Sequence, residues 1–226
     1  MSTRPTTTPP AAPRTETAET PAGTARITWY PARPARSARL VLAVGHGAGG
    51  GIEARDLVAL AAALPARGVT VALVEQPWRV AGKKVAAAPK VLDEGWRGLW
   101  PALARPGLPV VAGGRSAGAR VACRTAAELG AAGVLALAFP LHPPGKPENS
   151  RAGELTGAGV PTLVLQGGRD PFGRPEEFPE GGHELVEVPG ADHGLAVPRK
   201  ADPGQEAVLE LVTASVADWL DRLVPA

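Results

Sequence analysis

The segment of residues 109–120, PVVAGGRSAGAR, constrains the fold of this chain more than any other stretch. Residues 109–112 predict a short buried strand that ends at the following glycines, and a helix is predicted directly after the serine. Between them, Gly114, Ser116 and Gly118 form the pattern GxSxG, in which the serine occupies a strained turn and the two glycine positions must be small. Such a turn exposes the hydroxyl above a sheet, so we predict a nucleophilic serine in a strand–turn–helix unit.

Length and composition fit a single α/β domain. The chain has 226 residues, of which 44% are apolar and 20% are charged, and this is enough to bury a full sheet with its helices. The formal net charge is +2, and residues 1–39 hold six arginines against Glu16 and Glu19. The remainder of the chain is therefore slightly acidic, and we expect no nucleic-acid partner.

The compartment is inferred from cysteine usage and hydropathy. A single cysteine, Cys123, excludes an intrachain disulfide and favours a reducing compartment. No apolar leader opens the sequence, and no run approaches the roughly 18 apolar residues of a membrane span. We therefore expect a cytoplasmic protein without a membrane partner.

The first part of the chain divides into a predicted tail and the start of a sheet. Residues 1–24 are rich in threonine, proline, alanine and glutamate, so we predict a disordered tail there and one folded domain over residues 25–226. Residues 25–30 predict an edge strand. Residues 39–44, RLVLAV, form a continuous apolar run that is typical of a central strand buried on both faces.

A glycine-rich stretch, GHGAGGG at residues 45–51, follows this central strand. Gly45, Gly47 and Gly50 form GxGxxG, and Glu75 ends the next predicted strand, as an acid that binds a ribose would. One interpretation is therefore a dinucleotide-binding loop. However, the helical pattern begins only after Gly50, so this glycine would lie in the loop and could not allow the close packing of helix on strand that the fingerprint requires.

We favour a different role for the same loop, next to the predicted nucleophile. The backbone N–H of Ala48, opposite that of Ala117 at the start of the helix, would complete an oxyanion hole. His46 belongs to this loop and becomes a candidate substrate-binding residue.

The remaining segments continue the alternation of strands and helices. Trp96, Leu99, Trp100 and Leu103 fall on one helix face, residues 134–139, 162–166 and 184–188 predict three strands, and an amphipathic helix closes the chain. Only residues 140–161 separate two of these strands. This length leaves no room for a large cap domain.

Asp170 and His193 each follow a separate predicted strand, after the strand that leads to Ser116. Catalytic groups collect at the carboxyl ends of parallel strands. A serine nucleophile needs an imidazole to accept its proton and a carboxylate to orient that imidazole. The chain order therefore predicts the triad Ser116, Asp170 and His193. Asp192 could replace Asp170 in principle, but a residue directly before His193 is not expected to reach the ring nitrogen of that histidine. We therefore interpret Asp192 as a loop or capping residue.

Cationic side chains are expected beside this triad. Arg115 lies within the turn itself, and the loop FPLHPPGKPE carries His142 and Lys146, so these three are candidate substrate-binding residues. Arg120 follows one helical turn after the serine. These cations would favour a substrate with a carboxylate or phosphate. Alternatively, the arginines pair with acids of the scaffold, such as Glu75 or Glu94.

Five motifs together, GHGAGG, GGRSAGAR, FPLHPPGKPE, LQGGRDPFG and ADHGL, resemble the compact α/β-hydrolases of the dienelactone-hydrolase type. The resemblance runs from about Arg39 to the C-terminus and is weakest in the first strand. It is closest to a branch that includes a testis-expressed vertebrate protein and a domain in a subunit of a histone-acetyltransferase complex. The resemblance implies an α/β-hydrolase fold with an eight-stranded, mostly parallel sheet, helices on both faces and a serine-hydrolase triad.

We therefore expect hydrolysis of a small-molecule ester or thioester through an acyl-enzyme on Ser116, without a cofactor or a metal ion. The complex subunit in the same branch supplies an alternative, a binding or scaffold protein that keeps the fold. Dinucleotide binding by GHGAGG is the third hypothesis. The residues do not specify an oligomeric state.

Overall fold

The apolar runs of the sequence form an eight-stranded sheet in the computed structural model, which describes residues 12–225. The strands are β1 (Arg14–Thr20), β2 (Gly23–Tyr30), β3 (Leu40–Gly45), β4 (Val69–Glu75), β5 (Val110–Arg115), β6 (Gly133–Leu137), β7 (Thr162–Gly167) and β8 (Glu184–Val188). They lie in the order β1-β2-β4-β3-β5-β6-β7-β8. Strand β2 alone runs opposite to the other seven strands, which confirms the mostly parallel sheet that the sequence predicts.

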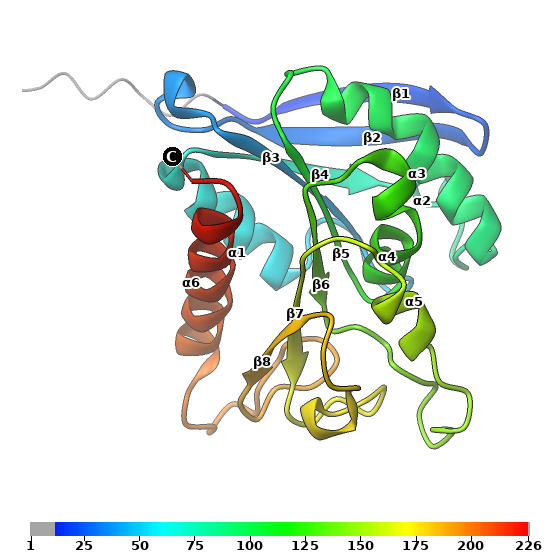
Figure 1. The fold of residues 1–226 in the computed structure, drawn as a ribbon, viewed down its shortest axis with the longest axis vertical. Helices are drawn as coiled ribbons and strands as arrows, with labels where there is room; N and C mark the ends of the chain where they lie inside the picture. The colour runs from blue at the N-terminus through cyan, green and yellow to red at the C-terminus, as the bar shows by residue number, and fades with distance from the viewer. Residues whose placement is uncertain (1–11, 226) are drawn as a thin grey trace, which may run out of the picture.

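Helices cover both faces of this sheet (Figure 1). One layer consists of α1 (Arg55–Ala63) and α6 (Gln205–Leu223), and the other of α2 (Pro77–Val80), α3 (Pro89–Ala104), α4 (Ala117–Leu129) and α5 (Ala152–Thr156). Three short 3-10 helices, η1 (Ala35–Ser37), η2 (Leu64–Arg67) and η3 (Pro175–Glu177), lie in the connections. The segment between β6 and β7 contains only α5, which confirms the absence of a large cap. Within the described range, no helix has the length and hydropathy that crossing a membrane requires.

Strand β3 separates two apolar cores. Leu40, Leu42 and Val44 belong to the core beneath α1 and α6, and Val41 and Ala43 belong to the core beneath the opposite helices. All five side chains are fully buried. The prediction of a central strand buried on both faces is therefore confirmed.

Helix α4 lies close to the sheet because its inner face is made of small side chains. Ala119, Ala122 and Ala126 are fully buried against the strands. Cys123 lies on the same face, and burial raises the pKa of its thiol to about 12. This cysteine is therefore a small apolar core residue without a reactive thiolate at neutral pH.

Strand β5 extends further than its apolar run. The sequence predicts an end before Gly113, but the strand continues through Gly113 and Gly114 to Arg115. Both glycines pair with β3 on one side and β6 on the other. The backbone ladder continues where the apolar side chains stop, and this brings the end of the strand up to Ser116.

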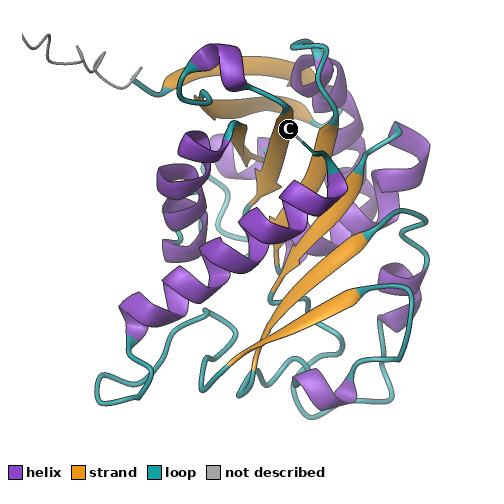
Figure 2. Cartoon of the chain, turned by 60° about the vertical axis from the view of Figure 1, so that its left-hand side comes forward, coloured by secondary structure: helices purple, strands orange, loops and turns teal. Residues whose placement is uncertain are grey.

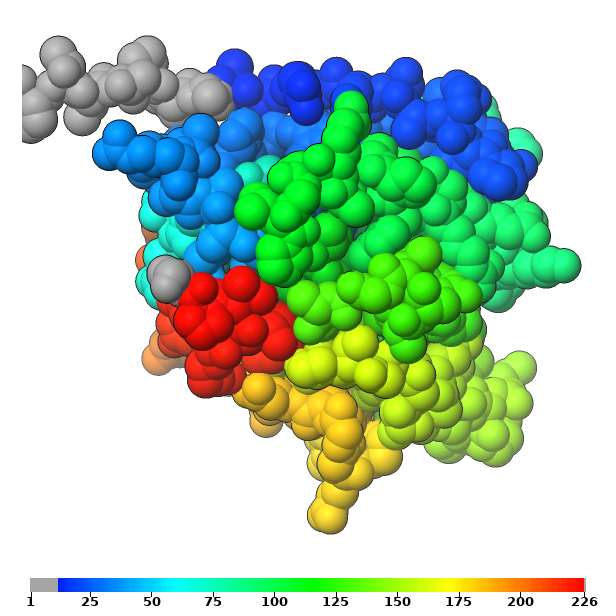
Figure 3. Space-filling view, turned by 45° about the horizontal axis from the view of Figure 1, so that its top comes forward, coloured from blue at the N-terminus to red at the C-terminus, as the bar shows by residue number. Residues whose placement is uncertain are grey.

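The C-terminal part of the predicted tail, residues 12–24, is ordered, which corrects the prediction of disorder for this part of residues 1–24. Strand β1 pairs antiparallel with β2 over its whole length. It therefore forms the edge of the sheet, and residues 25–30 lie in the second strand instead of at the edge. Figure 3 shows the blue N-terminal strands along the rim of the molecule beside green α3. Residues 1–11 of the predicted tail lie outside the described residues.

Strand β1 escaped prediction because its inward side chains are not strongly apolar. Glu16, Ala18 and Thr20 are partly buried, and the residues between them are exposed. Glu16 accepts a hydrogen bond from the indole N–H of Trp29 at 2.8 Å and pairs with Arg105 at 2.6 Å. The period of two is present, but polar partners replace the usual apolar contacts.

The alternation of β1 is testable with a matched pair of substitutions. Ala18 packs against the core, so we expect Ala18→Glu to lower the free energy of unfolding by about 1–3 kcal/mol. Thr17 is exposed, and Thr17→Glu should change it by less than about 0.5 kcal/mol. Urea denaturation of both variants measures the difference. Equal stability of the two variants would show that β1 is not packed as described.

Candidate functional site

Ser116 alone forms the turn between β5 and α4. Its backbone has φ 53° and ψ −110°, a strained conformation for a residue with a side chain. Its N–H donates to the carbonyl of Leu137 at 2.9 Å, and its carbonyl accepts from the N–H of Arg120 at 3.2 Å. The strain is therefore held by hydrogen bonds on both sides of the serine.

The two glycines of GxSxG are required by close backbone contacts. A Cβ atom on Gly118 would lie 2.6 Å from the carbonyl oxygen of Gly45 and 2.9 Å from that of His46. A Cβ atom on Gly114 would overlap the backbone of Gly118. Side chains at these positions would push α4 away from β3 and β5, so the pattern has the structural cause that the sequence predicts.

The structure brings the three predicted triad residues together. Nε2 of His193 lies 2.9 Å from Oγ of Ser116, and Nδ1 of His193 lies 2.7 Å from Oδ2 of Asp170. Both distances are within hydrogen-bond range, so the imidazole connects the hydroxyl to the carboxylate.

Asp170 is buried and its carboxylate is fixed by several donors. Oδ1 accepts from the N–H of Phe172 at 2.8 Å, and Oδ2 accepts from Nε2 of Gln166 at 2.9 Å. The ring of Phe172 lies against that of His193 with a centroid distance of 4.2 Å. These contacts orient the carboxylate and restrain the imidazole.

Asp192 shapes the loop that carries His193. Its Oδ1 accepts from the N–H groups of Gly194 at 2.7 Å and Ala196 at 3.0 Å. It makes no hydrogen bond with the imidazole of His193, in agreement with the loop role that the sequence predicts.

Arg115 connects the serine turn to the same loop. Its guanidinium donates through Nη2 to the carbonyl of His193 at 2.8 Å, and its Nε lies 3.3 Å from Oδ2 of Asp56. Asp56 is fully buried in α1. Burial raises the pKa of Asp56, and the charge of Arg115 opposes that rise. Arg115 thus holds the backbone of the His193 loop in place.

An open cleft of about 430 Å³ lies above Ser116. It is lined by Gly47, Ala48, Gly49, Arg115, Ser116, Ala117, Arg120, Pro140, Arg151, Phe172 and His193. These residues come from the end of β5, the first turn of α4 and the loops at the carboxyl ends of the parallel strands, which Figure 2 shows in teal beyond the orange strands. The cleft therefore occupies the edge of the sheet where the sequence predicts it.

Both predicted oxyanion residues, Ala48 and Ala117, line this cleft. The N–H of Ala117 is the first of α4, so it has no acceptor within the helix. A Cβ atom on Gly47 would lie 3.4 Å from Cβ of Ser116, so the loop that carries Ala48 passes directly over the serine. Ala48 and Ala117 thus belong to two separate segments that both lie beside the serine.

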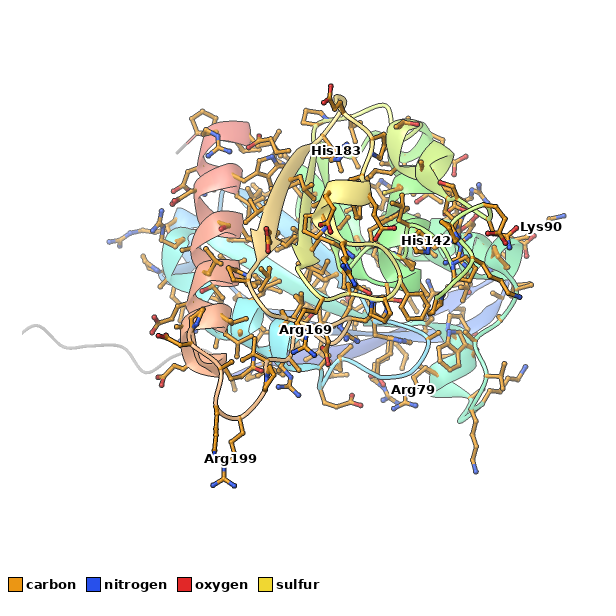
Figure 4. All side chains as sticks on the ribbon, turned by 90° about the horizontal axis from the view of Figure 1, so that it is seen from below. Arg79, Lys90, His142, Arg169, His183 and Arg199 are labelled. Carbon is orange, nitrogen blue, oxygen red and sulfur yellow. The ribbon has the colours of Figure 1, made fainter. Side chains whose placement is uncertain are left out.

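Two histidines predicted as substrate contacts are buried outside the cleft. Nε2 of His46 accepts from the N–H of Gln76 at 3.2 Å, and burial lowers the pKa of His46. Nε2 of His142 lies 2.9 Å from a carboxylate oxygen of Glu177. The contact of His142 with the Pro143 carbonyl raises its pKa, and Glu177 adds to this effect. In Figure 4, His142 is labelled among the loops on the side of the molecule away from α6. The ring nitrogens of His46 and His142 thus form hydrogen bonds within the protein. This corrects the prediction that these two residues contact the substrate.

Lys146 is also outside the cleft. Its N–H donates to the carbonyl of Pro143 at 3.0 Å, and this turn leaves the side chain exposed at the outer end of the loop. The cleft residues that sequence reasoning missed are Pro140, Arg151 and Phe172. Phe172 follows two residues after Asp170 in the motif RDPFG, so its place beside the triad could have been predicted from the sequence. No feature of the sequence places Arg151 in the cleft.

The glycine-rich loop does not have the geometry of a dinucleotide fingerprint. Helix α1 begins only at Arg55, so Gly50 lies in the loop. Glu75 is paired with Arg26 at 3.0 Å. No cluster of three or more potential metal-ligating His, Cys, Asp or Glu side chains occurs among residues 12–225.

Comparison with known proteins agrees with this architecture. The family described as an alpha/beta hydrolase domain matches residues 36–221 of the chain. A search of curated proteins finds no match to this chain.

Three solved structures illustrate the likeness of fold. XC6422 from Xanthomonas campestris, described as an α/β serine hydrolase without lid, has a TM-score of 0.69 at 20% identity, over 96% of this chain and 97% of that one. Dienelactone hydrolase from Anabaena variabilis has a TM-score of 0.71 at 18% identity, over 94% and 98%. Est1E from Butyrivibrio proteoclasticus has a TM-score of 0.68 at 15% identity, over 92% and 98%.

The close contact at Gly118 is testable by a single methyl group. Because the added Cβ would meet the backbone of β3, Gly118→Ala should lower the free energy of unfolding by at least about 2 kcal/mol. Gly153 in α5 has no atom within 4 Å of such a Cβ, and Gly153→Ala should leave stability unchanged or raise it by up to about 1 kcal/mol. Urea denaturation compares the two, and a Gly118→Ala variant as stable as wild type would contradict the described contact.

Proposed function

The chain belongs to the α/β-hydrolase family, and from this premise we propose that it hydrolyses a small ester or thioester through an acyl-enzyme on Ser116. The observation that carries the proposal is the continuous series of hydrogen bonds from Ser116 through His193 to Asp170. A buried carboxylate, an oriented imidazole and an exposed hydroxyl are the groups that nucleophilic catalysis by serine requires.

Acylation begins with the hydroxyl of Ser116. As Oγ attacks the carbonyl carbon of the substrate, Nε2 of His193 accepts the hydroxyl proton. The bond from this carbon to the alcohol or thiol then breaks, and His193 donates the same proton to the leaving group. Asp170 holds Nδ1–H throughout and stabilises the positive charge on the imidazole.

The substrate carbonyl oxygen gains negative charge in this step. The N–H groups of Ala48 and Ala117, which line the cleft together with Ser116, are the proposed donors to that oxygen. The position of Ala117 at the start of α4 adds the positive end of the helix dipole. These donors are fixed by the backbone before the substrate binds, so little reorganisation accompanies the reaction.

Deacylation repeats the sequence with water. His193 accepts a proton from a water molecule that attacks the acyl carbon, and the bond to Oγ of Ser116 breaks. The proton returns to Ser116, and the free acid leaves. No other reactant is consumed.

The shape of the cleft supports a small substrate. It has a volume of about 430 Å³, and no cap domain covers it. Among the proteins of similar fold, Est1E has been solved with ferulic acid bound. A small-molecule ester is therefore the substrate class that we propose for this chain.

The identity of the nucleophile is tested by covalent labelling. We expect a fluorophosphonate probe to label the wild-type protein and not Ser116→Ala. Ser150, an exposed serine, provides the control, and Ser150→Ala should label as the wild type does. In-gel fluorescence measures both. Labelling that persists in Ser116→Ala would refute the assignment, and an unlabelled wild-type protein would favour the binding or scaffold function.

The roles of the other two residues are tested by turnover of a short 4-nitrophenyl ester. His193→Ala and Asp170→Asn should each lower kcat by about 10⁴-fold, because the first removes the base and the second disturbs its tautomer. Asp192→Asn keeps an oxygen for its two backbone N–H groups and should cause a far smaller loss. Equal losses in Asp170→Asn and Asp192→Asn would contradict the assigned triad. Circular dichroism confirms that each variant is folded.

A further inference from the structure

The cleft above Ser116 has an unbalanced set of charges. Three arginines, Arg115, Arg120 and Arg151, line it, and no aspartate or glutamate does. Any carboxylate that compensates these positive charges must therefore lie behind the cleft wall.

Two of these arginines have carboxylate partners. Arg115 is paired with the buried Asp56 and also binds the carbonyl of His193. Arg120 forms two parallel hydrogen bonds to Glu154, from Nε at 2.7 Å and from Nη2 at 2.5 Å. Both are therefore held by the scaffold, although by other acids than the sequence suggests.

Glu154 is shared with a further arginine behind the cleft. Arg124 donates to Glu154 at 2.9 Å and forms two more hydrogen bonds to Asp93, at 2.9 and 2.6 Å. Around Glu154, the guanidinium groups of Arg120, Arg124 and Arg151 thus share only two carboxylates. One positive charge is left over.

Arg151 is the arginine without a carboxylate. Its Nη1 donates to the carbonyl of Pro140 at 3.1 Å, and no salt bridge joins it to any acid within residues 12–225. Burial lowers the pKa of Arg151, and the neighbouring charge of Arg120 lowers it further; the charge of Glu154 opposes this fall but does not cancel it. A partly buried guanidinium beside another cation would gain from an anion bound in the cleft.

We propose that Arg151 binds a carboxylate on the acyl part of the substrate, so that the preferred substrates are monoesters of dicarboxylic acids. This proposal rests on the hydrolase function proposed above. A single surplus charge matches a monoanion, and the planar guanidinium matches the two oxygens of a carboxylate. The acyl part stays on Ser116 through both half-reactions, so a charge contact there positions the carbonyl in each of them.

The substrate preference is tested with monoethyl adipate and ethyl hexanoate, which share the leaving group and the length of the acyl chain. We expect wild type to have the higher kcat/KM for monoethyl adipate. Arg151→Gln should lower the ratio of the two kcat/KM values by about ten- to a hundredfold, and Arg151→Lys should restore part of it. A ratio that changes by less than about twofold in Arg151→Gln would overturn the proposal.

The matched control is Arg199, which projects into solvent from the loop before α6 (Figure 4). Arg199→Gln removes the same charge away from the cleft and should leave the ratio at its wild-type value. An equal fall in Arg199→Gln would mean that overall charge, and not the cleft, sets the preference, and this result would also overturn the proposal.

A binding experiment separates this proposal from the catalytic one. Calorimetry of monoethyl adipate with the Ser116→Ala protein should give a Kd that becomes at least about tenfold weaker when Arg151→Gln is added. No binding, or an unchanged Kd, would overturn the carboxylate site. If binding depends on Arg151 while the wild-type protein resists the fluorophosphonate, the hydrolase function fails and the carboxylate site stands.

Discussion

The contact between Gly118 and the end of β3 determines the geometry of the candidate site. Because neither Gly118 nor Gly45 has a side chain, α4 approaches the sheet until its first turn touches the β3 backbone. Ser116 is thereby forced into its strained conformation, and the loop after β3 passes over it at Gly47. One backbone contact thus places the hydroxyl and both proposed oxyanion donors, and it leaves no space for a side chain at Gly118.

The other half of the triad depends on a second close contact, between the end of β7 and the loop that follows β8. A Cβ atom on Gly167 would lie 2.5 Å from the carbonyl oxygen of Ala191, so the loops that carry Asp170 and His193 leave the sheet in contact. The N–H of Arg169 also donates to that carbonyl at 2.9 Å. The parallel pairing of β7 and β8 therefore sets the separation of Asp170 and His193. Arg115 connects the loop of His193 to the turn that carries Ser116.

The sequence predicts the features of the fold and site that depend on the local chain. The central strands are continuous apolar runs, and Ser116, Asp170 and His193 lie after the ends of β5, β7 and β8. Strand β1 was missed because Glu16 and Thr20 occupy inward positions and find polar partners. The direction of a loop side chain is also not local, since His46 turns inward to accept the N–H of Gln76. The charge balance around Arg151 depends on how Arg120 and Arg124 of α4 pair with Glu154 and Asp93, so only the tertiary structure reveals it.

The central claim is that an ester is cleaved through a covalent bond to Ser116, and its most direct test is mass spectrometry of the protein quenched in acid during turnover. The account predicts an increase in intact mass equal to the acyl group of the ester supplied, located by peptide mapping on the fragment that contains Ser116. This adduct should form faster than it is hydrolysed for at least one ester in a series of chain lengths, and the accompanying burst of alcohol should approach one equivalent per protein. An adduct on a different fragment, or steady turnover with neither a burst nor an adduct for any ester in the series, would contradict the account.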